Sequence, residues 1–299
     1  MDKVLVIVGP TASGKSALAV SLACHYNGEI ISGDSVQVYR QLNIGTAKIT
    51  TAEQKGIPHH LLDIKDFTEN YSVYDFQKKG REIIKQLNQN NKLPIVVGGT
   101  GLYIKALLYD YQFKEEDNDV SDYQDFDNQE LYNMIQVQDP QAAAKLHKNN
   151  RKRLLRTLSL LASLPTNKSD FLAQQKKQAI YDVLIIGLTL DRRQLHQRIS
   201  DRVEMMFSAG LLKEVESLVK GDLKVFDYQA FQAIGYKEFK AFFLNENSLE
   251  EIKEKIRAHT RQFAKRQYTW FNNQMPVQWV DSNKSDYLDK IHNLVNQWL

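Results

Sequence analysis

Eight residues near the start of the chain have the types and spacing of a phosphate-binding loop. They read GPTASGKS and stand between an apolar run and a helical pattern, which is the context that such a loop requires. Glycines let backbone N–H groups turn toward phosphate oxygens, and the start of the following helix adds positive potential. The lysine adds a full charge, and the serine hydroxyl commonly ligates Mg²⁺. We therefore predict, with Ser16 as the metal ligand, that phosphates are held by Gly9, Pro10, Thr11, Ala12, Ser13, Gly14, Lys15 and Ser16.

Two further polar residues, Asp34 and Thr100, follow predicted strands in glycine-containing turns. Ligands of open α/β sheets bind beyond the carboxyl ends of the strands, so both positions favour a functional role. An aspartate there could hold Mg²⁺ through water or act as a general base. It could instead cap a helix or a turn, and the position alone leaves both interpretations open.

Basic residues recur on two predicted helices in the second half of the chain. Arg198 and Arg202 lie four residues apart, so they share a helix face that could close over phosphates. In residues 251–271, the helical spacing places Arg257, Arg261 and Lys265 on one side, where they could follow a nucleic-acid backbone. An ordinary solvated face would have the same pattern in both helices. The opposite, apolar side of residues 251–271 consists of Ile252, Ile256, Phe263 and Trp270.

The elements that position these residues follow the pattern of an α/β protein. Apolar, β-branched runs predict strands at 4–8, 29–32, 93–97 and 183–190. Helical periodicity predicts helices at 16–26, 72–90, 191–220 and 248–272. Strands that alternate with helices indicate a parallel sheet covered on both faces. Between residues 112 and 178 the strand signal vanishes, and we predict a mostly helical insertion there; from residue 191 onward we expect helices.

The composition is that of a globular protein with balanced charge. The chain has 299 residues, 42% hydrophobic and 25% charged, with a formal net charge of +3. No apolar run approaches the roughly 18 residues of a membrane helix, and we expect no signal peptide because residues 1–3 lead directly into a strand. The only cysteine, Cys24, excludes an intramolecular disulfide. We expect Cys24 to be a small core residue of the first helix, and the compartment to be reducing.

Charge is nevertheless segregated within the insertion. Residues 115–130 contain eight acidic residues and no basic one. Residues 145–156 contain six basic residues and no acidic one. This segregation is typical either of two opposed electrostatic faces or of two ordinary solvated helix faces.

Taken together, the motifs resemble those of bacterial tRNA dimethylallyltransferases, in order and over nearly the whole chain. The phosphate loop is shared by many enzyme classes, whereas the other motifs are far more selective. The resemblance implies a P-loop NTPase-like α/β core at 1–112 and 180–299, with a helical insertion at 113–179 that contacts tRNA. The motifs are GPTASGKS at 9–16, DSVQVYRQLNIGTAK at 34–48, PHHLLD at 58–63, VVGGTGLY at 96–103, DP at 139–140, RISDRVEMMFSAGLLKEV at 198–215, AIGYKE at 233–238 and TRQFAKRQYTWF at 260–271.

The resemblance implies transfer of a five-carbon group from dimethylallyl diphosphate to N6 of the adenosine 3′ to the anticodon of tRNA. The loop then holds the diphosphate, which is released, instead of hydrolysing ATP. Lys15, Ser16 and Mg²⁺ would neutralise the departing diphosphate together with Arg202, and the backbone of residues 12–15 would cradle it. Asp34 would be the general base for the N6 proton. Thr100 would hydrogen-bond the target base or the substrate.

The resemblance also implies where tRNA binds. The family flips the target adenosine into a channel, as chemistry on a base generally requires. The segment that reads this base matches Asp34, Ser35, Val36 and Gln37. The chain departs from the family pattern at Lys148 and Ser159, which weakens the transfer of roles inside the insertion. The remaining residues implied for tRNA binding are Thr100, Lys152, Arg153, Leu154, Leu155, Arg156, Arg257, Arg261 and Lys265.

Three other functions fit parts of the sequence. An isopentenyltransferase acting on free AMP, ADP or ATP would share the loop and the base, but it would need neither the basic insertion nor the basic ridge. A small-molecule kinase would explain the loop and the arginine pair, but not DSVQVY or GGTGLY. A non-catalytic RNA-binding module would not need Asp34. We expect a cytoplasmic monomer that uses tRNA and dimethylallyl diphosphate and no membrane; whether a nucleotide also occupies the loop stays open.

Overall fold

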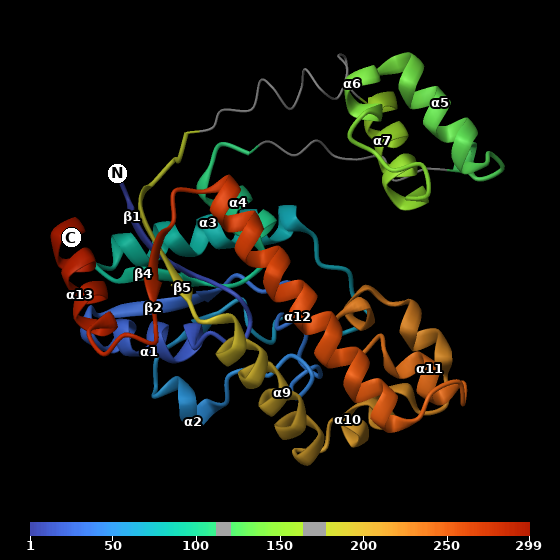
Figure 1. Ribbon diagram of the computed structural model, residues 1–299. Coiled ribbons are helices and arrows are strands. Elements are labelled where there is room, and N and C mark those ends of the chain that lie inside the picture. Colours follow the sequence, from blue (N-terminus) through green and yellow to red (C-terminus); the bar gives the residue numbers. More distant parts are fainter. Residues whose placement is uncertain (112–120, 164–177) are drawn as a thin grey trace. The chain divides into compact units, whose positions relative to one another are not determined.

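The computed structural model describes residues 1–111, 121–163 and 178–299 and divides into two compact units (Figure 1). Unit 1 contains Met1–Leu108 and Ala179–Leu299, and unit 2 contains Tyr109–Gln178. Unit 2 therefore begins at residue 109, whereas the sequence analysis placed the start of the insertion at 113. Much of the acidic half of the insertion lies outside the described residues. Within the described ranges, no helix has both the length and the apolar character needed to cross a membrane.

Unit 1 is built on a six-stranded parallel sheet with the strand order β3-β2-β4-β1-β5-β6. In β1, Leu5 pairs with Ile95 of β4 on one side and with Leu184 of β5 on the other. Residues 4–8 of β1 are completely buried, as expected for a strand covered on both faces. The predicted parallel α/β core is thereby confirmed. The strands are β1 (Lys3–Val8), β2 (Gly28–Ser32), β3 (His59–His60), β4 (Leu93–Val97), β5 (Asp182–Thr189) and β6 (Gln278–Asp281).

The two edge strands, β3 and β6, were not predicted. β3 has only two residues, and β6 lies in a stretch that we expected to be helical. Both are too short and too polar to show the apolar run that marks the central strands. They become strands by pairing with β2 and β5 respectively. Their existence is therefore a tertiary property that the local pattern does not contain.

The helices of unit 1 largely follow the predicted ranges. Ser72 caps α3 by accepting a hydrogen bond from Asp75 N. The helical stretch at 191–220 is divided in two at Gly210, whose φ of 98° interrupts it. In Figure 1, the long helix α12 lies beside α9, and the C-terminal end of α12 reaches α4. The helices are α1 (Lys15–His25), α2 (Thr51–Gln54), α3 (Val73–Gln89), α4 (Gly101–Leu108), α9 (Arg192–Ser208), α10 (Leu211–Val219), α11 (Phe239–Phe243), α12 (Leu249–Gln274) and α13 (Tyr287–Trp298), with 3₁₀ helices at Leu223–Asp227 and Gln229–Gln232.

One face of the sheet packs against α1 and α13. Leu22 of α1 and Ile291 of α13 belong to the same buried cluster as the strand residues Ile7 and Ile186. Cys24 does not join this core but is exposed, so its predicted position was wrong. The reason is that the buried face of α1 is occupied by Leu18, Ala19, Val20, Leu22 and Ala23.

Unit 2 has a small core of its own. Leu131 and Ile135 of α5 pack in one cluster with Leu154 and Leu158 of α7. Leu154, which we predicted to bind tRNA, is completely buried in this cluster. That prediction was wrong, because the four-residue spacing of Leu154 and Leu158 turns both side chains toward α5. The described elements of unit 2 are a 3₁₀ helix at Ser121–Tyr123, α5 (Asn128–Gln138), α6 (Pro140–Ala143) and α7 (Arg151–Ser163).

Candidate active site

The predicted phosphate loop joins β1 to α1 at the carboxyl end of the sheet. Gly9 has a φ of 140°, and a Cβ there would lie 2.7 Å from Leu188 O, so the position requires glycine. Gly14 has a φ of 91° and occupies the N-cap of α1 without a side-chain hydrogen bond to the first turn. The N–H groups of that turn therefore remain suited to an anion.

Three charged side chains from separate elements lie close enough at this loop to influence one another. Lys15 Nζ donates a hydrogen bond to Pro10 O at 2.6 Å. Burial, and then the charge of Arg202, lower the pKa of Lys15 to about 7, while Asp34 opposes this shift. Burial also lowers the pKa of Arg202, again against the effect of Asp34. The structure thus brings together three of the residues that the sequence analysis selected for catalysis.

The two arginines of the predicted pair, both on α9, have different surroundings. Arg202 Nη2 donates a hydrogen bond to Thr46 O at 3.0 Å, whereas Arg198 is exposed. The neighbouring Asp201 accepts a hydrogen bond from Gln197 Nε2 at 2.8 Å. Of the predicted arginine pair, Arg202 is therefore the member that is held near Lys15 of the loop.

Asp34 follows β2 and organises the start of an irregular stretch, residues 34–48, which we call the 34–48 segment. Asp34 Oδ1 accepts hydrogen bonds from Val36 N at 2.8 Å and from Gln37 N at 3.3 Å. Gln37 Nε2 donates to Thr46 O at 3.3 Å. The same carbonyl accepts from Arg202, so Thr46 O connects the residue predicted to read the base with the residue predicted to contact the phosphate.

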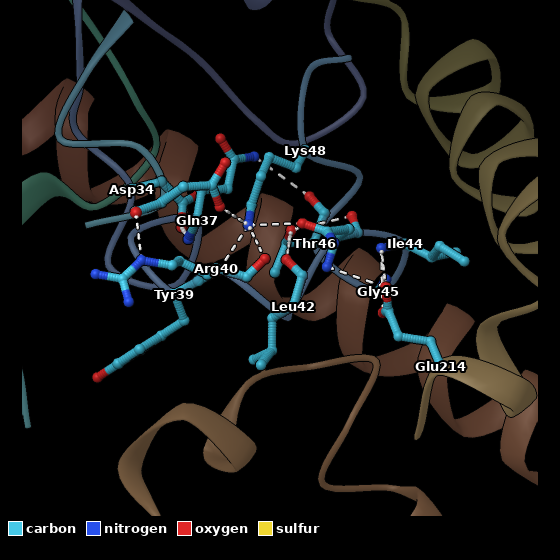
Figure 2. A network of polar contacts seen from close by, with 12 residues as sticks. Asp34, Gln37, Tyr39, Arg40, Leu42, Ile44, Gly45, Thr46, Lys48 and Glu214 are labelled. Carbon is cyan, nitrogen blue, oxygen red and sulfur yellow. Dashed lines mark hydrogen bonds and ion pairs between the residues drawn. The ribbon is translucent and has the colours of Figure 1, made fainter. Parts of the chain in front are cut away.

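The far end of the 34–48 segment is held by residues that the sequence analysis did not single out. Glu214 of α10 accepts hydrogen bonds from Ile44 N at 2.9 Å and from Gly45 N at 3.2 Å (Figure 2). Tyr236 Oη donates to Glu214 at 2.6 Å. Figure 2 also shows Lys48 Nζ among oxygen acceptors of the segment. Glu214 and Tyr236 lie inside selective family motifs, and this was the signal in the sequence that could have identified them. No spacing rule predicts that their side chains contact the 34–48 segment.

Thr100 lies in a turn whose glycines allow close packing. A Cβ on Gly99 would lie 1.9 Å from Nε2 of Gln267 on α12. The Thr100 hydroxyl lies 3.5 Å from the hydroxyl of Ser35, the neighbour of Asp34. Thr100 and Asp34 follow β4 and β2, which are adjacent in the sheet, so the two residues lie at neighbouring strand ends.

The predicted basic ridge of α12 is interrupted. Arg257 forms ion pairs with Glu204 and Glu254. Its charge is therefore compensated within the protein, and these ion pairs would have to open for Arg257 to bind RNA. Arg261 Nη2 donates a hydrogen bond to Ser200 Oγ at 2.9 Å, while Lys265 is exposed.

The buried face of α12 also differs from the predicted one. Ile252 and Ile256 are buried as expected, whereas Phe263 and Trp270 are half-buried. Toward the C-terminal end the buried residues are Ala264, Gln267 and Phe271. The sequence analysis missed Gln267 because a polar residue is normally assigned to the solvent side of an amphipathic helix.

Helix α7 of unit 2 carries the basic residues of the insertion. Lys152, Arg153 and Arg156 are exposed, and Leu155 is half-buried. These four residues stay predicted contacts for tRNA.

The oxygen donors near the phosphate loop suit a hard divalent cation. Across the described residues, no group of three or more His, Cys, Asp or Glu side chains is placed to hold a metal ion. Ser16 is exposed at the start of α1, and Asp34 acts electrostatically on the adjacent Lys15. Mg²⁺ typically combines one or two protein oxygens with phosphate oxygens and water. The residues present therefore fit a divalent ion that binds together with a diphosphate.

Comparisons with known proteins agree with the motifs. A family model described as IPP transferase matches residues 37–274. The chain is 44% identical to a tRNA dimethylallyltransferase of Anoxybacillus flavithermus, over 100% of this chain and 96% of that protein. The fold is similar to a tRNA delta(2)-isopentenylpyrophosphate transferase from Staphylococcus epidermidis, with a TM-score of 0.75, 40% identity and 99% of each chain covered. It is also similar to a eukaryotic dimethylallyltransferase acting on tRNA, with a TM-score of 0.87 and 30% identity over 98% of this chain and 78% of that chain. With its motifs, fold and full-length relatives in agreement, the chain belongs to the IPP transferase family.

Proposed function

We propose that this protein transfers the dimethylallyl group of dimethylallyl diphosphate to N6 of the adenosine 3′ to the anticodon of tRNA, position 37, and releases diphosphate. The observation that carries the proposal is that Lys15, Arg202 and the carboxylate of Asp34 lie within electrostatic range of one another at the phosphate loop. Two cations suit a diphosphate leaving group, and a carboxylate suits the removal of a proton from an amine. The names of the relatives, tRNA dimethylallyltransferase, support the same reaction.

The phosphate loop acts on the leaving group. The bond between the dimethylallyl carbon and a diphosphate oxygen breaks, and negative charge develops on that oxygen. Lys15, Arg202 and the N–H groups at the start of α1 stabilise this charge. When bound, Mg²⁺ would neutralise further charge on the diphosphate, with Ser16 as its protein ligand.

Asp34 acts on the incoming amine. The N6 nitrogen forms a bond to the dimethylallyl carbon and loses a proton, which Asp34 accepts. The backbone hydrogen bonds to Asp34 use Oδ1, so we assign the proton to Oδ2. An aromatic amine is a poor nucleophile, and orientation of both reactants therefore matters as much as the base.

The recognition of tRNA is distributed over several elements. Ser35, Val36, Gln37 and Thr100 lie beside Asp34 at the strand ends and read the target base. The other contacts follow the phosphate backbone, which basic side chains bind without sequence preference. We further propose that the protein acts as a monomer in the cytoplasm. The backbone contacts are Lys152, Arg153, Leu155 and Arg156 of α7 and Arg261 and Lys265 of α12.

The test is an incorporation assay with labelled dimethylallyl diphosphate, Mg²⁺ and either unmodified tRNA or AMP. We expect the wild type to label tRNA and Asp34→Asn to lose about 10²–10⁴-fold in rate, the range of a lost general base. Asparagine keeps the oxygen that accepts from Val36 N and Gln37 N but cannot take up the proton. Asp289→Asn, on the exposed surface of α13, is the matched control.

Each other outcome of this assay points to a different conclusion. Label in AMP would favour an enzyme of free adenine nucleotides. Label in neither acceptor, with ATP-dependent phosphorylation of a metabolite instead, would exclude the transferase. Full activity of Asp34→Asn would leave the reaction in place and remove Asp34 as its base.

A further inference from the structure

Gln267 is a buried polar residue that no step of the proposed reaction uses. It lies on α12 with 6% of its surface exposed. Burying an amide is unfavourable unless its donor and its acceptor both find partners. The partners of Gln267 therefore indicate what the residue does.

Both ends of the Gln267 amide are hydrogen-bonded, and each bond goes to a different loop of the site. Oε1 accepts a hydrogen bond from Thr11 N at 2.9 Å, and Nε2 donates to Gly99 O at 3.0 Å. One partner is a donor and the other an acceptor, so the orientation of the amide is uniquely specified. Gln267 is thus a bridge between the phosphate loop and the turn that carries Thr100.

The bridge continues toward the proposed general base. Thr100 directly follows Gly99, and its hydroxyl lies 3.5 Å from that of Ser35, next to Asp34. A series of contacts therefore runs from Thr11, on the diphosphate side, to Asp34, on the base side. Gln267 is the member of this series that α12 contributes, and it joins the phosphate loop to the turn.

The glycines of the turn are spaced to admit side chains of α12. A Cβ on Gly99 would lie 1.9 Å from Gln267 Nε2, and a Cβ on Gly101 would lie 2.1 Å from Trp270. Any other residue at Gly99 would displace the Gln267 amide, and any other residue at Gly101 would displace the Trp270 ring. The close contact at Gln267 is therefore built into the GGTG motif as well as into α12.

We propose that Gln267 is a positioning residue that couples the binding of dimethylallyl diphosphate to the binding of the target base. This inference rests on the proposed function. The amide sets the separation between the loop that holds the leaving group and the turn that faces the nucleophile. Reaction requires the two reactants at near-attack distance, and misplacement by about 1 Å can cost about 10²-fold in rate.

The test compares Gln267→Met with Gln262→Met, an exposed position on the same helix. Methionine keeps the length of glutamine and removes both hydrogen bonds. For Gln267→Met we expect kcat for transfer to tRNA to fall by about 10- to 100-fold. In the wild type, inorganic diphosphate should change the Kd for tRNA by about fivefold or more, and tRNA should change the Kd for diphosphate equally. In Gln267→Met, the Kd for tRNA should be nearly the same with and without diphosphate, so the ratio of these two Kd values should approach one.

A second route to the same contact keeps the test decisive if methionine lowers stability. Gly99→Ala should displace the Gln267 amide and lower kcat, while the double variant Gly99→Ala/Gln267→Ala should be no worse than Gln267→Ala alone. Effects that simply add, or a Kd ratio that persists in Gln267→Met, would overturn the inference. A loss of activity that parallels a fall in melting temperature, while the Kd ratio stays at its wild-type value, would also overturn the inference. A wild type that labels no tRNA would instead overturn the proposed function, and the inference with it.

Discussion

The phosphate loop and the 34–48 segment lie at the same edge of the sheet but owe their conformations to different parts of the chain. The loop is shaped largely by its own residues, with Gly9 and Gly14 at positive φ and the start of α1 next to it. The 34–48 segment has little regular structure and is held near its C-terminal end by distant side chains. Arg202 binds Thr46 O, and Glu214 binds the N–H groups of residues 43–45.

This difference shows why one region is recognisable in any sequence and the other mainly within its family. A loop specified by local dihedral angles carries its signature in a few consecutive residues. A segment specified by long-range hydrogen bonds has its determinants scattered over α9, α10 and the stretch around Tyr236. If the contrast holds, the two regions should respond differently to substitution and to pH.

The largest expected effect concerns the charge of Lys15, which belongs to the phosphate loop. The pKa of Lys15 is lowered to about 7, chiefly by burial, so raising the pH above this value removes the charge. We expect the affinity for inorganic diphosphate to fall by up to about tenfold per pH unit there, as measured by calorimetry. Lys15→Met should bind weakly throughout and show only the ionisation of diphosphate itself. A wild-type profile parallel to that of the variant would contradict this prediction.

The contribution of Lys15 to folding stability changes with pH in the opposite direction to the affinity for diphosphate. In the unfolded chain the lysine titrates at its ordinary value of 10.5, above the folded value. Between these two pH values the unfolded state binds more protons, so the contribution of Lys15 to stability rises with pH. Weaker diphosphate binding at high pH is therefore not a consequence of unfolding through this residue.

A smaller effect is expected from Glu214, which holds the 34–48 segment. Glu214→Ala leaves the backbone N–H of Ile44 without its acceptor, while the N–H of Gly45 keeps only Tyr236 Oη, at 3.1 Å. We expect a loss of about 1–3 kcal/mol in the free energy of unfolding, the usual cost of such unsatisfied groups. Hydrogen exchange should accelerate at residues 43–46 and stay unchanged at 9–16. Glu216→Ala, exposed on the same helix, is the control, and equal acceleration in both regions would break the contrast.

The smallest expected effect concerns tRNA affinity and compares two basic residues of α12. Lys265 and Arg257 fall on the same predicted ridge, but of these two only Arg257 forms ion pairs with acidic neighbours among the residues that the structure describes. Lys265→Gln should lower tRNA affinity modestly and reduce the slope of log affinity against log salt by about 1. Arg257→Gln should leave that slope unchanged. Equal slopes for the two variants would show that the ion pairs open when RNA binds.

Much of the site was predictable because its determinants are local. Lys15 and Ser16 follow from the loop motif. The place of Asp34 and Thr100 after strands favoured a functional role but left a cap open for Asp34, and the family resemblance supplied their roles. For Arg202, helix spacing left a phosphate contact and a solvated face both open, and the family resemblance favoured the contact. The structure then separated Arg202 from Arg198 by its hydrogen bond to Thr46 O. That separation depends on how α9 packs, which a four-residue spacing cannot reveal.

By itself, the sequence determined the parallel α/β core, the phosphate loop and the family, because apolar runs, glycine positions and motif order are read along the chain. The tertiary structure alone decided that β3 and β6 are strands, that Leu154 is buried, and that Arg257 is neutralised. It also decided that Gln267 and Glu214 reach the site from α12 and α10. The physical reason is the same in each case: edge pairing, burial and hydrogen bonds between distant residues depend on which surfaces meet, and no local pattern records that.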